Sequence, residues 1–110
     1  MAIRITEDFD VLEVFEKDGL LYLKSSGNLF SGLREIRGYC NDGEDINYKN
    51  GKKDGKYFWW DDDGFTIEEG SYKNGKQDGI CRCYYSSSSS IACEILYDKG
   101  FEVSKRYYER

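Results

Sequence analysis

The sequence contains no histidine and no proline. Without histidine it lacks the side chain that most often acts as a general base, and also a common metal ligand. The cysteines therefore have no imidazole that could activate them as nucleophiles. Without proline, no residue prevents neighbouring strands from pairing. These absences predict a protein that is not an enzyme, and they permit an uninterrupted sheet.

Long apolar runs are missing as well. No window approaches the roughly 18 apolar residues that a membrane helix needs. The first residues, MAIRITEDFDVLEVF, lack the apolar segment of a signal peptide. We therefore expect a cytoplasmic protein with no stable membrane insertion.

Basic residues are outnumbered, since 16 lysines and arginines face 21 acidic residues, for a net charge of −5. An acidic chain is not attracted to nucleic acid by its overall field, but it favours a basic partner. The same charge would equally serve solubility. The prediction is a basic protein partner and no nucleic acid.

The acidic runs and the cysteines lack the spacing of known metal sites. Neither Glu7–Asp10 nor Asp61–Asp63 has the alternating oxygen ligands of a calcium loop. The four cysteines, of which only two are close together in a CRC sequence, also lack paired CxxC motifs. They are Cys40, Cys81, Cys83 and Cys93. We expect reduced, mostly buried thiols, no metal, no cofactor, and a stability that neither reductant nor chelator changes.

One stretch of the sequence occurs twice. YKNGKKDGKYFWW begins at Tyr48 and YKNGKQDGICRCY begins at Tyr72, an offset of 24 residues. A broken copy, YDKG, opens at Tyr97, and a weaker one, YLKSSGNLFSG, opens at Tyr22. Repeats of 20–50 residues indicate stacked supersecondary units.

Each unit is predicted to be a β-hairpin. Asn-Gly and Asp-Gly supply the positive φ angles that tight hairpin turns require. Between them lie runs of strand-forming residues: KYFWW, FTIEEGSY, ICRCYY and IACEILY. We predict four consecutive antiparallel strands in Lys56–Tyr97. The turns are expected near Asn50–Asp54, Asp61–Gly64, Asn74–Asp78 and Ser86–Ser90. The segment EDFDVLEVF could form a strand or one short helix.

The order of these letters resembles the MORN repeat. A Tyr is followed by Asn-Gly-Lys, Asp-Gly, aromatic residues and an acidic turn ending in Gly. More narrowly, the pattern is similar to the bacterial variant in small antitoxin-like and immunity-like proteins. The similarity covers roughly Asp18 to Gly100 and is most specific in the two central units. It implies an all-β fold, an antiparallel meander of stacked hairpins that forms one curled sheet, without known catalytic residues.

The repeats suggest an organisation for the whole chain. Residues 1–110 are predicted to form a single domain with a strand or cap segment at its N-terminus. The predicted parts are 1–19 (N-terminal segment), 20–47 (degenerate first repeat), 48–71 and 72–96 (full repeats) and 97–110 (partial repeat).

Alternation along the strands separates two faces. One face is predicted to hold Tyr57, Trp59, Cys81 and Cys83. The other is predicted to hold the candidate partner-binding residues Phe58, Trp60, Arg82 and Tyr84. The letters YFWW do not alternate between apolar and polar, so either both faces are covered or one apolar face is open. Residues 1–20 or the end of the chain could cover the second face. If they do not, its Trp, Tyr and Arg side chains are typical of binding hot spots.

These observations and the resemblance together predict a non-enzymatic protein-binding module. The resemblance favours an immunity or antitoxin protein that neutralises a cognate, basic toxin by direct binding. The alternatives are a MORN-type scaffold associated with membrane phospholipid or another protein, and a glycan binder with an aromatic face. Open sheet edges also permit a homo-oligomer.

Overall fold

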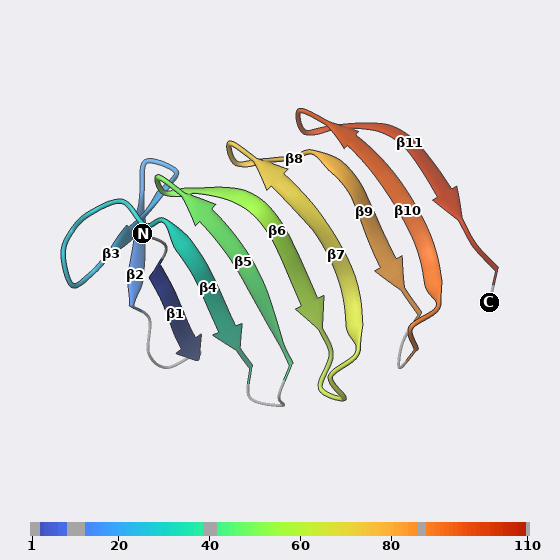
Figure 1. Ribbon diagram of the computed structural model, residues 1–110, viewed down its shortest axis with the longest axis horizontal. Coiled ribbons are helices and arrows are strands. Elements are labelled where there is room, and N and C mark those ends of the chain that lie inside the picture. The colour runs from blue at the N-terminus through green and yellow to red at the C-terminus, as the bar shows by residue number, and fades with distance from the viewer. Residues whose placement is uncertain (1–2, 9–12, 39–41, 86–87, 110) are drawn as a thin grey trace.

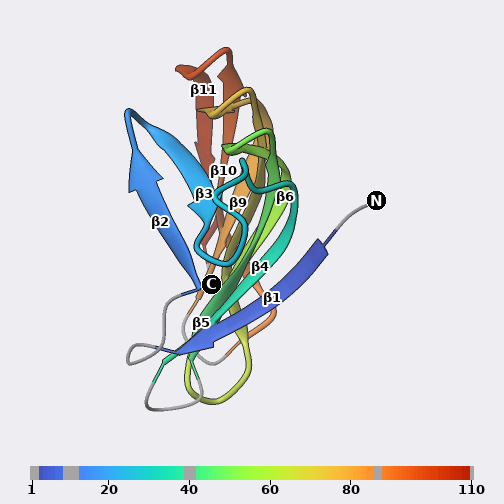
Figure 2. The same cartoon turned by 90° about the vertical axis from the view of Figure 1, so that its left-hand side faces the viewer.

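The fold is all-β and consists of one large curled sheet with a small hairpin beside it (Figures 1 and 2). The computed structural model describes residues 3–8, 13–38, 42–85 and 88–109. Its strands are β1 (Ile3–Asp8), β2 (Val14–Lys17), β3 (Leu20–Leu23), β4 (Gly32–Arg37), β5 (Gly43–Lys49), β6 (Lys52–Trp60), β7 (Thr66–Lys73), β8 (Lys76–Gln77), β9 (Gly79–Tyr84), β10 (Ile91–Asp98) and β11 (Phe101–Tyr107). The large sheet has the order β1-β4-β5-β6-β7-β9-β10-β11, with β8 paired to β7, and β2 pairs with β3 separately.

The predicted antiparallel meander is confirmed. Strands β6, β7, β9 and β10 pair antiparallel in succession, as their strand-forming residues and short turns indicate. Of the predicted serine turn, Ser86 and Ser87 lie outside the described residues. The turn is closed by the Tyr85 N–H, which donates to the Ser90 carbonyl at 3.0 Å. Sequence patterns therefore sufficed for this central part of the sheet.

The N-terminal segment differs from a simple meander. In EDFDVLEVF, the first two residues end β1 and the last two begin β2, so no described residue is helical, while residues 9–12 lie outside the described part. Strand β1 pairs with β4 in parallel, from Ile3 with Gly32 to Asp8 with Arg37. A parallel pair needs a long crossover connection. The segment that contains the β2–β3 hairpin supplies it.

Four described hairpins turn in the same way. In each, two central residues both have positive φ, which is the pattern of type I′ turns. These pairs are Asp18-Gly19, Asn50-Gly51, Asn74-Gly75 and Lys99-Gly100. Because this turn geometry matches the twist of the strands on either side, the short turns set the register of each hairpin.

The Asp-Gly pairs, predicted as parts of turns, have a different role. Gly55 lies inside β6 with a φ of 103°, where the register with β5 shifts. Gly79 has a φ of 92° at the start of β9, beyond the break between β8 and β9. Each strand therefore resumes at once after the Asn-Gly turn, and the Asp-Gly pair marks an irregularity within or between strands.

This irregularity connects one hairpin to the next. The Asp54 carboxylate accepts a hydrogen bond from the Asn74 N–H at 3.1 Å. The Gly75 N–H donates to the Lys53 carbonyl at 2.8 Å. The next turn repeats the backbone contact, since the Gly100 N–H donates to the Gln77 carbonyl at 2.8 Å. The repeated letters therefore encode contacts between units as well as the turns themselves.

Replacing Asp54 by alanine should lower the free energy of unfolding by about 0.5–1.5 kcal/mol, because the Asn74 N–H loses its acceptor. Urea denaturation measures the change. Asp62→Ala is the matched control, since Asp62 is exposed in the Asp61–Gly64 turn. Equal losses in the two variants would contradict a link between hairpins.

The core lies on one face of the large sheet. Its buried residues are Ile5, Val14, Leu21, Phe30, Ile46, Tyr48, Tyr57, Cys81, Cys93 and Ile95. The β2–β3 hairpin packs on the N-terminal part of this face through Val14 and Leu21 (Figure 2). Farther along, large and small side chains alternate: the Tyr57 hydroxyl lies 3.2 Å from the Cys81 sulfur. A Cβ at Gly70 would come within 2.7 Å of the Tyr57 ring, so Gly70 leaves the space that the ring fills.

The two edges of the large sheet are β1 and β11. Strand β11 is exposed along its whole length, and Phe101 is 76% exposed. Two features of β11 oppose pairing with another chain. Its register with β10 shifts between Leu96 and Tyr97, and it carries the charged residues Lys105 and Arg106. Association through an edge stays a prediction.

Candidate partner-binding face

The face opposite the core has no strand over it in the described part of the chain. We call it the outer face and define it by the side chains of Lys56, Phe58, Glu69, Ile80, Arg82, Glu94, Leu96 and Arg106. Its central row crosses five strands, because the register pairs Phe58, Glu69, Arg82, Glu94 and Arg106 in sequence. Partners in a register share a face, so these side chains project to the same side. Neither the N-terminal hairpin nor β11 covers this row: the hairpin packs on the core face, and β11 extends the sheet.

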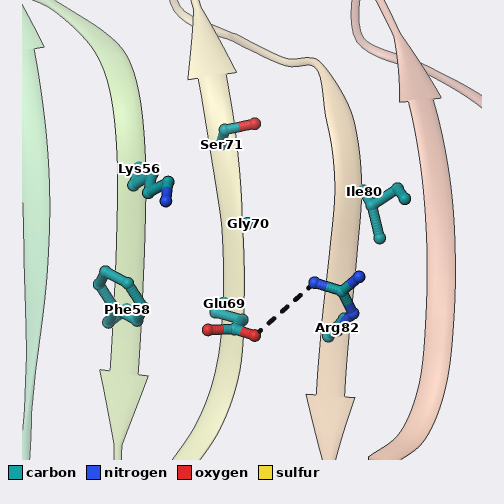
Figure 3. Close-up of a pocket in the computed structure, with 7 residues that line it drawn as sticks. All are labelled: Lys56, Phe58, Glu69, Gly70, Ser71, Ile80 and Arg82. Carbon is teal, nitrogen blue, oxygen red and sulfur yellow. Dashed lines mark ion pairs between the residues drawn. The ribbon is translucent and has the colours of Figure 1, made fainter.

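The structure brings three of the four predicted binding residues together around Glu69. Phe58 and Arg82 lie on either side of it in the register. The Tyr84 hydroxyl donates a hydrogen bond to Glu69. Figure 3 shows the shallow hollow between Phe58 and Arg82, which has a volume of about 210 Å³ and also includes Ile80 in its lining.

Trp60, the fourth predicted residue, sits at the end of β6 in a different setting. Its ring lies against Gly43, where a Cβ would come within 3.0 Å of it. The Arg37 guanidinium lies 4.7 Å from the ring centroid. Trp60 therefore contributes to packing between β5 and β6 as well as to the surface.

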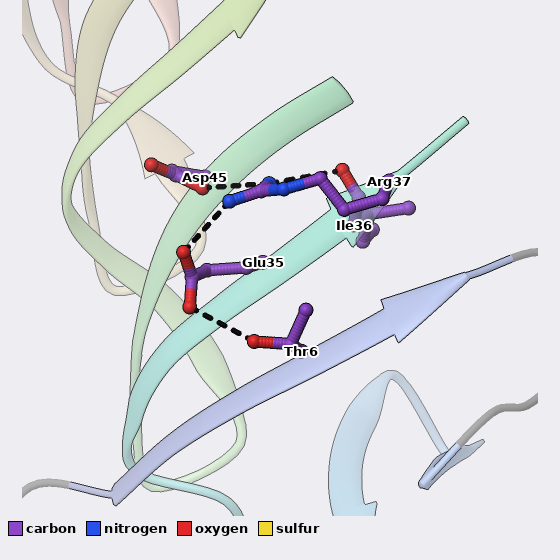
Figure 4. A network of polar contacts seen from close by, with 5 residues as sticks. All are labelled: Thr6, Glu35, Ile36, Arg37 and Asp45. Atoms are coloured by element: carbon purple, nitrogen blue, oxygen red, sulfur yellow. Dashed lines mark hydrogen bonds and ion pairs between the residues drawn. The ribbon is translucent and has the colours of Figure 1, made fainter. Parts of the chain in front are cut away.

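Figure 4 shows the polar network that surrounds Arg37. Arg37 donates to Glu35 at 2.7 Å and to Asp45 at 3.3 Å. The Thr6 hydroxyl donates to the other oxygen of Glu35 at 3.0 Å. Glu35 is only 3% exposed, so its carboxylate is buried with bonded partners. This network joins β1, β4 and β5, and it forms the N-terminal boundary of the outer face.

Two apolar side chains widen the candidate site. Ile80 and Leu96 pair across β9 and β10, and they are 48% and 39% exposed. The sequence analysis missed Leu96. It could have been found from the two-residue period of the strand, because its neighbour Ile95 is buried on the core face and Leu96 must then point to the outer face.

Charges alternate along the central row. Arg82 donates to Glu94 at 2.9 Å and lies 4.0 Å from Glu69. Partial burial and the hydrogen bond to Glu69 raise the pKa of Tyr84 to about 12, so its phenol stays a neutral donor near neutral pH. Ion pairs this exposed add little stability. They can exchange partners when another surface docks, without much cost to the fold.

The lysine-rich turns lie beside the core face instead. A groove of about 530 Å³ separates the β2–β3 hairpin from the stacked turns, and Lys52, Lys53 and Lys76 are part of its lining. The Lys53 ammonium lies 5.1 Å from the centroid of the Tyr72 ring. The positive charge of the turns is therefore separate from the outer face.

Two groups of described side chains bring metal-ligand types together. One is Asp61–Asp63. There the Asp61 carboxylate accepts the N–H groups of Asp63 and Phe65, both at 3.0 Å, and so stabilises its own turn. The other group, on the core face, is Glu68, Cys81 and Cys83. No such grouping was predicted from the cysteine spacing.

No family model matches the chain, and neither a curated protein nor a solved structure matches it. The resemblance to the MORN repeat accordingly stays a proposal that rests on the repeated letters. None of the described residues belongs to a helix long and apolar enough to cross a membrane.

Proposed function

We propose that the chain is a non-enzymatic module that binds a partner protein on its outer face. One observation carries the proposal. Half-buried Phe58 and exposed Ile80 and Leu96 lie beside Arg82 on a face that no described strand covers. Apolar surface next to arginine and tyrosine is typical of the centre of protein interfaces.

The shape of the face favours a macromolecule over a small ligand. The hollow of about 210 Å³ beside Phe58 and a second one of about 300 Å³ beside Leu96 lie at or below the lower end of the range of about 300–1,000 Å³ that is usual for small-molecule pockets. The central row instead crosses β6, β7, β9, β10 and β11. At a strand spacing of about 4.8 Å, it is roughly 19 Å wide, which suits the broad surface of another protein.

The proposed partner is a basic toxin, and the chain would act as its immunity or antitoxin protein. The net charge of −5 would speed the encounter with a basic protein, since opposite fields steer association. Stoichiometric docking would then block the active site of the toxin or its substrate path. Such a protein must act where the toxin acts, and we place it in the cytoplasm.

Co-expression with the proteins encoded beside this chain tests the proposal. The chain is expected to restore growth of cells that produce a basic toxic neighbour, and to co-purify with that protein. Arg82→Ala should weaken both effects, because it removes the guanidinium at the centre of the outer face. Absence of rescue, together with binding to anionic vesicles or to a glycan array, would favour the scaffold or glycan-binding alternatives.

A further inference from the structure

The core face contains a cluster of thiols and a carboxylate that the proposed partner binding does not use. Glu68 lies on β7, and Cys81 and Cys83 lie on β9. Their sulfur and oxygen atoms all lie within 4.8 Å of one another. Both cysteines are free thiols, as is Cys93, which pairs with Cys83 across β9 and β10. The register places Glu68 beside Cys83, so residues 15 positions apart in the sequence meet.

We propose that Cys81, Cys83 and Glu68 bind a thiophilic divalent cation, Zn²⁺. Tetrahedral zinc has bonds of about 2.3 Å to sulfur and about 2.0–2.2 Å to oxygen, which sets ligand atoms roughly 3.6–3.8 Å apart. The Cys83 sulfur lies 3.8 Å from a Glu68 oxygen. Small side-chain rotations would therefore complete the coordination. Because Cys83 is partly exposed, water can fill a fourth position and the ion has a route in.

Neighbouring side chains already orient these ligands. The Tyr57 hydroxyl donates to Oε2 of Glu68 at 2.8 Å and lies 3.2 Å from the Cys81 sulfur. The side-chain amide of Gln77 donates to the same hydroxyl at 3.3 Å. Tyr57 thus fixes one carboxylate oxygen, and the other faces Cys83. Hydrogen bonds of this kind orient metal ligands and raise affinity.

Zinc binding would be accompanied by proton release. Cysteine binds zinc as a thiolate, so the thiol protons of Cys81 and Cys83 would pass to solvent as the two Zn–S bonds form. Two thiolates and one carboxylate around Zn²⁺ would leave only about one negative charge at the partly buried site.

The cysteine spacing alone predicts a chelator-insensitive protein. The proposed site predicts the opposite, because the strand register places Glu68 beside the CRC sequence.

Titration of the reduced, metal-free protein with Zn²⁺ tests the site, and Co²⁺ serves as a spectroscopic probe. We expect one zinc per chain, a Tm that zinc raises and a chelator lowers again, and a cobalt spectrum with thiolate charge-transfer and tetrahedral ligand-field bands. Cys83→Ser and Glu68→Gln should each weaken zinc binding at least about 100-fold, because even residues behind a ligand contribute 10–100-fold.

Glu69→Gln is the matched control, since this neighbour of Glu68 lies on the outer face. It should leave zinc affinity unchanged within about threefold, well below the loss that a ligand causes. Circular dichroism checks that each variant folds. If Glu68→Gln does not fold, the comparison of Cys83→Ser with the unaltered protein still decides. Equal zinc affinity in those two proteins, or cobalt binding without sulfur bands, would overturn the proposal. The partner-binding residues lie on the other face, so either proposal can fail without the other.

Discussion

Replacing Tyr57 by alanine is expected to lower the free energy of unfolding by about 3–5 kcal/mol, as for other large buried aromatic residues. Tyr57 is 6% exposed, and its ring centroid lies 5.1 Å from that of Tyr72. Its ring also fills the space over Gly70. Because small domains are stable by only about 5–15 kcal/mol, this one change removes a large fraction of the total. Urea denaturation, followed by tryptophan fluorescence, measures it.

Two further variants separate the causes. Tyr57→Phe keeps the ring but removes the hydroxyl that contacts Glu68 and Cys81, so it should cost about 1–2 kcal/mol. Trp59→Ala removes a larger side chain from the same face, but Trp59 is 46% exposed. Its loss should be less than half that of Tyr57→Ala. Equal losses for Tyr57→Ala and Trp59→Ala would show that the core is not centred on Tyr57.

Arg82→Ala is expected to weaken partner binding by about 2 kcal/mol or more, roughly a 30-fold loss of affinity. Arg82 lies in the middle of the outer face, between Glu69 and Glu94. Phe58→Ala should act similarly, because Phe58 lines the same hollow. The ion pairs of Arg82 are partly exposed and contribute little to folding, so its Tm should stay nearly constant. Calorimetric titration with the partner and thermal melts are measured on the same samples.

The structure makes Arg82→Ala a clearer test of the binding face than Trp60→Ala. From the sequence, Trp60 and Arg82 are equivalent candidates. In the structure Trp60 packs against Gly43 and beneath Arg37, so Trp60→Ala should lower stability as well as any affinity. Lys53→Ala is the control for the Arg82 variant, because Lys53 lines the groove beside the core face. Unchanged binding by Arg82→Ala, or a collapse of its Tm, would contradict a binding face centred on Arg82.

Much of the sheet could be predicted because its determinants are local. Asn50-Gly51 and Asn74-Gly75 require positive φ, and each pair alone encodes a tight turn between strands. Alternation then separates Tyr57 from Phe58, and the offset of 24 residues places Cys81 and Arg82 on the corresponding faces. The four proposed binding residues remain a prediction, which the observed faces support for Phe58, Arg82 and Tyr84 in particular.

Other features depend on partners that the local sequence does not specify. Asp54-Gly55 looks like a second turn, but the stacking of hairpins makes Asp54 an acceptor for Asn74 in the next unit. The parallel pairing of β1 with β4 likewise follows from how the β2–β3 hairpin crosses over the sheet. Contacts between residues this far apart in the chain leave no recognisable pattern in the sequence around either partner.

By itself, the sequence determined the hairpins, their Asn-Gly turns and the division of side chains between two faces. These follow from backbone φ preferences and the two-residue period of a strand, which act within a few residues. Only the tertiary structure decided which face the N-terminal hairpin covers, and that Glu68 meets Cys81 and Cys83. Packing and strand register join residues far apart in the chain. Their outcome depends on the total of many weak contacts, which no single stretch of the sequence contains.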